Sequence, residues 1–139
     1  MPGNRNLEEL IASMKPTLHD ATYVYCCFRD FELPHGLTPL CLFRETEGLT
    51  AIVAREDAAR AGLPWTFACR MITLAVHSAL EAVGFLATIA VRLAQAGIAC
   101  NVVAAYHHDH LFVPEDRAQE ALALLAGLQD TTASAQPRR

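Results

Sequence analysis

The segment Ser78–Phe85 combines residue types that can hold a small zwitterion. An amphipathic helical pattern follows it, so its backbone N–H groups would lie at a helix N-terminus, which favours an anion such as a carboxylate. Gly84 permits close approach of a ligand or of neighbouring backbone, and Glu81 can hold an ammonium group. A capped helix start, with Gly84 used for packing and Glu81 solvated, explains the same residues, and the motif alone does not decide between the two interpretations.

A second polar cluster consists of His107, His108, Asp109 and His110. Three such side chains bind zinc or a related ion when they converge. On a hairpin, however, successive side chains alternate between faces, so at most two of the four share a side. We therefore predict a polar turn in which Asp109 bonds to backbone amides and the imidazoles line an interface or face solvent. A pH-sensitive interface and a metal-dependent enzyme built on the three histidines are the alternatives.

The cysteines do not form a catalytic or disulfide pattern. There are five of them, without C-x-x-C spacing, and all lie in or beside apolar strand-like stretches, where a thiol behaves as a small hydrophobe. We therefore expect reduced, structural thiols in a reducing compartment. Ser78 follows His77, yet no Gly-x-Ser-x-Gly elbow surrounds it, so a hydrolase is not indicated.

Composition restricts the class of protein further. The 139 residues, 53% of them hydrophobic, can bury one core or two tightly fused half-domains. Eleven Lys and Arg against fifteen Asp and Glu give a net charge of −4, which argues against a general phosphate-backbone binder. The longest nearly uncharged helix-like run, Ala82–Val91, is far shorter than the ~20 residues of a membrane-spanning helix. We expect a cytoplasmic protein that binds neither nucleic acid nor membranes.

The first half of the chain reads as a helix followed by three strands and a short helix. Asn6 and Glu9 form a capping box for the first helix, which Pro16 ends. The β-branched and aromatic content predicts strands at residues 22–28, 40–45 and 49–54, the last two as a hairpin, and a short helix at 57–61.

The second half reads as strand, helix, strand, strand, helix. A mostly apolar strand at 67–76 precedes a helix that Gly97 ends; strands at 101–105 and 111–113 follow. Pro114 opens a last helix that Gly127 closes, and we expect Asp130–Arg139 to be disordered. This βαββα order predicts a two-layer, ferredoxin-like α/β sandwich.

Three stretches of the chain resemble a known family: Phe43–Thr50, Val76–Phe85 and Asn101–Val113. Together with a glycine at the helix start and Gly97-Ile98 before the next strand, they resemble the ACT domains, and among these the small stand-alone bacterial ACT-like proteins. The resemblance extends from about Ala21 to Gly127.

The resemblance implies an α+β fold of ferredoxin-like βαββαβ type, built from two fused ACT-like halves. We expect an irregular N-terminal half at residues 1–64, a C-terminal half at 65–130 and a disordered tail at 131–139. The C-terminal half has no predicted fourth strand, so its sheet must be completed by the first half or by a partner.

The resemblance also implies a non-enzymatic regulatory module that binds an amino acid or related metabolite at an interface, without metal or cofactor. We expect it to form homodimers and to regulate a separate protein. An alternative is a structural or protein-interaction module without a small-molecule ligand, which makes contact through the hairpin His107–His110. The residues that the resemblance places at the ligand are Ser78, Ala79, Glu81, Ala82, Val83, Gly84, Cys100 and Asn101.

Overall fold

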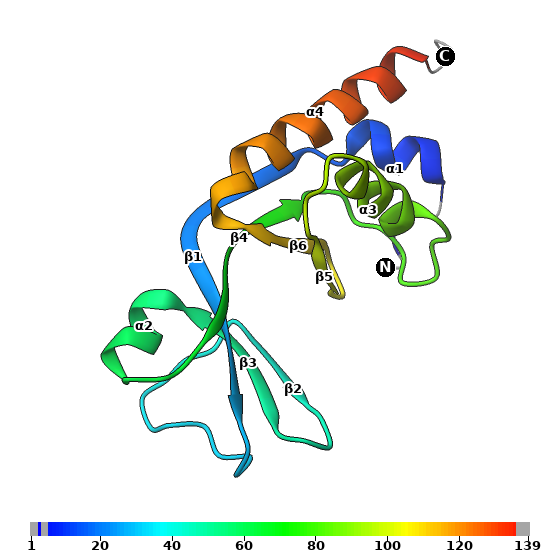
Figure 1. The fold of residues 1–139 in the computed structure, drawn as a ribbon. Helices are drawn as coiled ribbons and strands as arrows, with labels where there is room; N and C mark the ends of the chain where they lie inside the picture. The colour runs from blue at the N-terminus through cyan, green and yellow to red at the C-terminus, as the bar shows by residue number, and fades with distance from the viewer. Residues whose placement is uncertain (1–2, 4–5, 136–139) are drawn as a thin grey trace. The chain divides into compact units, whose positions relative to one another are not determined.

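The computed structural model of the protein describes residue 3 and residues 6–135. Along the chain the elements are α1 (Leu7–Ser13), β1 (Pro16–Phe28), β2 (Cys41–Arg44), β3 (Leu49–Ala54), α2 (Arg55–Arg60), β4 (Thr66–Leu74), α3 (Phe85–Gln95), β5 (Asn101–Ala104), β6 (Asp109–Pro114), the 3-10 turn η1 (Glu115–Arg117) and α4 (Ala118–Ala135) (Figure 1). The strand order is β2-β3-β1-β4-β6-β5. No helix of the described residues is long and apolar enough to cross a membrane.

The fold divides into two compact units. The central unit comprises Asp20–Arg70, and the terminal unit combines the residues up to His19 with those from Met71 onward. Strands β1 and β4 each contribute residues to both units.

The central unit is built on the predicted hairpin. Strands β2 and β3 pair antiparallel with Cys41 opposite Ile52, and β3 pairs antiparallel with β1, with Val24 opposite Val53. Val24 and Val53 are fully buried and pack with Ala58 of α2. The hairpin and the short helix are therefore confirmed.

The terminal unit contains the larger core. Buried residues of β4 and β6 pack against the apolar faces of α1, α3 and α4, and α1 lies against α4 (Figure 1). The side chain of Asn6 accepts a hydrogen bond from the Glu9 amide at 2.9 Å, as the capping pattern predicts. The βαββα order from β4 onward is also confirmed.

The fourth strand of the terminal unit is the start of β1. Strand β1 begins at Pro16 rather than at residue 22 and lies next to β4. A hydrogen bond of 2.7 Å joins His19 Nε2 on β1 to the Thr73 hydroxyl on β4. The sequence left two sources for the missing strand, the first half of the chain or a partner. In this structure the first half supplies it.

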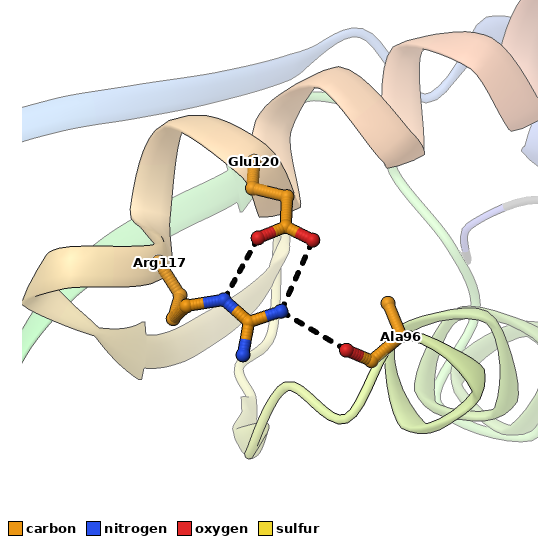
Figure 2. A network of polar contacts seen from close by, with 3 residues as sticks. All are labelled: Ala96, Arg117 and Glu120. Carbon is orange, nitrogen blue, oxygen red and sulfur yellow. Dashed lines mark hydrogen bonds and ion pairs between the residues drawn. The ribbon is translucent and has the colours of Figure 1, made fainter.

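Arg117 ties the end of α3 to the start of the last helix (Figure 2). Its guanidinium donates to both carboxylate oxygens of Glu120, at 2.8 and 3.0 Å, and to the Ala96 carbonyl at 3.0 Å. Because Ala96 caps α3, this contact satisfies a carbonyl that would have no partner within the helix.

Two predictions about the C-terminal region are wrong. Helix α4 continues past Gly127 to Ala135, so Gly127 does not close it and residues 130–135 are not disordered. Packing against α1 offsets the ~1 kcal/mol cost of a glycine within a helix, and Gln129 donates to the Ala12 carbonyl at 3.1 Å. Residues 136–139 of the predicted tail lie outside the described part of the chain.

Candidate functional site

The loop after β4 delivers the chain to the N-terminus of α3. Its last residue, Gly84, caps the helix at φ +88°, a left-handed conformation that favours glycine. The Gly84 carbonyl accepts from the Thr88 amide and hydroxyl, at 2.9 and 2.8 Å. The amides of the first turn, Phe85 to Ala87, precede the first intrahelical bond, and no side chain caps them. The helix start therefore presents donors and a partial positive charge.

Asp109 carries the negative charge of the site. It is the first residue of β6, and it shares a strand face with Leu111 and Val113, both in the core beneath the helices. Only 4% of Asp109 is exposed, and its Oδ2 accepts a hydrogen bond from the Ser78 hydroxyl at 2.8 Å. A buried carboxylate is thus held beside the start of α3.

Two neighbouring cavities share Ser78, Ala79 and Leu80. The first, which we name the helix-start cavity, has a volume of about 120 Å³. The second, which we name the rim cavity, has about 300 Å³. The helix-start cavity is further lined by Ala82, Gly84, Phe85, Leu86, Ala87, Ala104 and Asp109, and the rim cavity by Gly3, His77, Glu81 and Tyr106.

The structure brings together five of the eight residues that the sequence places at the ligand. Ser78, Ala79, Ala82 and Gly84 line the helix-start cavity, and Glu81 lines the rim cavity.

The other three residues line neither of these cavities. Val83 is 85% exposed. Cys100 packs against the core, where burial raises the pKa of its thiol to about 11. Asn101 is exposed on β5 opposite Phe112. Their membership of a ligand site stays a prediction.

The predicted role of Asp109 in a turn is wrong. The turn ends before Asp109, which is the first residue of β6, and its carboxylate accepts from the Ser78 hydroxyl rather than from backbone amides. The sequence did hold a signal: Asp109, Leu111 and Val113 alternate along one strand, so an inward carboxylate follows from the two inward aliphatic residues. Sequence reasoning missed this residue because it treated the cluster of four as one turn.

The histidines spread out rather than converge. His107 lies edge-on to Tyr106, with ring centroids 5.0 Å apart, and 5.7 Å from the His77 ring. His108 Nδ1 is 3.4 Å from the Val76 carbonyl oxygen. Within residues 3 and 6–135, no three His, Cys, Asp or Glu side chains are placed to hold a metal ion.

His110 belongs to a polar chain on the strands of the terminal unit. Its Nδ1 is 2.9 Å from the Thr73 hydroxyl, whose other neighbour is His19 Nε2 at 2.7 Å. Because a hydroxyl has one proton, it donates to one ring and accepts from the other. Burial, followed by the charge of His108, lowers the pKa of His110.

Comparison with known proteins identifies the type of domain. A family model described as an ACT domain matches residues 2–70, and a second, also described as an ACT domain, matches residues 66–127. No curated protein matches the sequence.

Three solved structures illustrate the likeness. A Vibrio cholerae protein of unknown function, described as a possible transport protein, is 43% identical over 88% of this chain and 95% of its own, with a TM-score of 0.78. An Agrobacterium tumefaciens protein is 16% identical over 82% and 87%, with a TM-score of 0.69. The ligand-free regulatory subunit of aspartate kinase from Thermus thermophilus is 10% identical over 84% and 97%, at 0.63. The last two show the fold alone, and the predicted ferredoxin-like fold with two ACT-type halves is confirmed.

Proposed function

Because the chain belongs to the ACT-domain family, we propose that it is a non-enzymatic regulatory module that binds an amino acid or a related small metabolite. The observation that carries the proposal is the pairing of Asp109 with the start of α3 in one cavity. A buried carboxylate and a helix N-terminus without a side-chain cap present opposite charges to the same small volume. A zwitterion complements both.

Each end of the zwitterion has a partner of suitable chemistry. A ligand carboxylate would accept from the amides of the first α3 turn, as anions do at helix N-termini. A ligand ammonium would donate to the Asp109 carboxylate in a charge-assisted hydrogen bond. The Ser78 hydroxyl, already bonded to Oδ2, orients that carboxylate.

Binding would regulate by shifting populations. A ligand that joins the Ser78–Gly84 loop to β6 stabilises the conformation in which both are ordered, and a partner that recognises this conformation then binds better. We propose a second copy of the chain and a separate regulated protein as such partners. Leu80 and Val83, which are 66% and 85% exposed on the loop, support a protein surface close to the ligand.

The same exposed residues also favour the second candidate, a protein-interaction module without a ligand. In that case the loop would be a docking surface, and the cavity would serve only to shape it. A ligand screen separates the two functions.

The test is thermal denaturation of the full chain in each of the twenty amino acids. A ligand at one hundred times its Kd stabilises the fold by about 2.7 kcal/mol, which raises Tm by several degrees. Asp109→Asn should abolish the rise, whereas Asp130→Asn, the same substitution at an exposed position of α4, should retain it. A screen in which no amino acid raises Tm would exclude this ligand class and favour the interaction module.

A further inference from the structure

The central unit contains a cavity that the proposed function does not use. Its volume is about 430 Å³, which is larger than either cavity at the start of α3. Small-molecule sites in proteins have volumes of about 300–1,000 Å³, so the cavity is large enough to hold one ligand. Each described residue that lines it belongs to the central unit, which therefore forms the cavity by itself.

The floor of this cavity is the face of the sheet that α2 does not cover. Cys26 of β1 packs into the core with Ala58 of α2. Because side chains alternate along a strand, Tyr25 and Cys27 lie on the opposite face. Thr50 of β3 is paired with Cys27 and shares this face. These three residues of the opposite face line the cavity.

The wall of the cavity is formed by residues 64–66, which lead into β4. Trp65 is 44% exposed. Phe67, the residue after the wall, has φ +62°, a conformation that is rare for an aromatic residue. Its ring lies 5.9 Å from the Tyr25 ring, centroid to centroid, so an aromatic contact joins the wall to the floor. Strained backbone of this kind is concentrated at ligand clamps and active sites.

The charge of the lining comes from Arg29. This residue is exposed and has no ion pair among residues 3 and 6–135, and none of the Asp and Glu side chains in these residues lines the cavity. Glu45 lies beside the floor, where its carboxylate accepts from the Thr50 hydroxyl at 2.5 Å. A ligand in the cavity therefore meets a guanidinium directly and a carboxylate only beyond Thr50. This arrangement favours an anionic group on the ligand.

We propose that this cavity binds a planar aromatic acid, whose ring packs against Trp65 and Tyr25 and whose carboxylate pairs with Arg29. Aromatic rings in contact attract each other beyond the area that they bury. A guanidinium holds a carboxylate through two parallel hydrogen bonds. The cavity lies in the central unit and the helix-start cavity in the terminal unit, so this second site is independent of the proposed function.

The test is an NMR titration of the full, isotope-labelled chain. Trp65 is the only tryptophan in the sequence, so its indole N–H gives one side-chain resonance that reports on this cavity. Phenylacetate should shift this resonance and bind about fivefold more tightly than its neutral isostere phenylacetamide, because it pairs with Arg29. It should bind about threefold more tightly than cyclohexylacetate, which has the same charge without the aromatic ring. Phenethylammonium should bind more weakly than phenylacetamide, because Arg29 repels it.

Variants assign the binding to residues. Arg29→Gln should weaken phenylacetate binding about fivefold and leave phenylacetamide binding unchanged. Trp65→Leu should weaken the binding of both probes about threefold, measured at the backbone amides of Cys27 and Thr66. Arg92→Gln, the same substitution as at Arg29 but on α3, should change none of the affinities. Arg29 and Trp65 are exposed, so both variants should keep the dispersed spectrum of the folded chain.

Three results would overturn the proposal. If phenylacetamide binds as tightly as phenylacetate, or Arg29→Gln has no effect, the ligand carboxylate does not pair with Arg29. If phenethylammonium binds more tightly than phenylacetate, Glu45 sets the charge of the ligand. If no probe shifts the Trp65 resonance, the cavity is not a site for aromatic acids. Each of these results leaves the amino-acid site at Asp109 standing, because Asp109→Asn tests that site in the other unit.

Discussion

Removing the Ser78 hydroxyl should destabilise the fold because it removes a partner of a buried charge. Asp109 is 4% exposed, and its Oδ2 receives the Ser78 hydroxyl at 2.8 Å. A hydrogen bond to a charged group contributes about 1.5–3 kcal/mol, and the carboxylate that loses it stays buried. Ser78→Ala should therefore lower the free energy of unfolding by about 2 kcal/mol. In the background of Asp109→Ala no carboxylate remains to be satisfied, and the same substitution should cost less than about 0.5 kcal/mol.

Urea denaturation of the wild type, the two single variants and the double variant measures this coupling. The difference between the two Ser78→Ala effects should be about 1.5 kcal/mol, within the range that directly contacting residues show. Ser13→Ala is the matched control, since its hydroxyl donates to the Glu9 carbonyl at an exposed position. It should stay within about 0.5 kcal/mol of the wild type. Equal effects of Ser78→Ala in both backgrounds would refute the assignment of a buried, charge-assisted bond.

Three further predictions concern the ends of α3, the polar chain and the thiols. Gly84→Ala and Gly97→Ala should each lower the free energy of unfolding in urea by about 1 kcal/mol, because both glycines have positive φ and an added Cβ meets nothing closer than 3.6 Å. Only Gly84→Ala should also reduce the rise in Tm that a ligand produces. An equal reduction by both variants would contradict the site. Because the pKa of His110 is lowered from 6.5, the folded state takes up its proton less readily than the unfolded state. The free energy of unfolding should therefore fall as pH drops below about 6.5. In His110→Gln the urea midpoint should change less between pH 7.5 and 5.5 than it does in the wild type. An equal change in both proteins would refute this. At pH 8 a thiol reagent should modify the exposed Cys27 rapidly and the half-buried Cys100 much more slowly, because a pKa of about 11 leaves little of the Cys100 thiol as thiolate. Equal rates in the Cys27→Ser and Cys100→Ser variants would contradict this difference.

Local sequence signals predicted most of the elements because each signal acts within one turn or one strand. The Asn6 cap, the β2–β3 hairpin and the Gly84 and Gly97 boundaries of α3 all depend on neighbours close in sequence. The same holds for the loop Ser78–Gly84, whose glycine and the helix start are adjacent along the chain.

Elements that depend on distant partners were not predictable in this way. The first residues of β1 lack a continuous apolar pattern, and their place beside β4 is visible only when residues such as His19 and Thr73 are seen to meet. Helix α4 likewise passes Gly127 because α1, more than one hundred residues away in the chain, packs against it.

The candidate site shows the same division. The amino-acid sequence by itself determined the loop Ser78–Gly84 and the helix that follows, since helix caps and positive-φ glycines are local requirements. Only the tertiary structure decided which carboxylate enters the helix-start cavity, because Asp109 reaches Ser78 across 31 positions of sequence. Strand pairing places β6 beside β4, so the loop after β4 lies next to Asp109. A buried carboxylate needs a hydrogen-bond donor, and Ser78 of this loop supplies it.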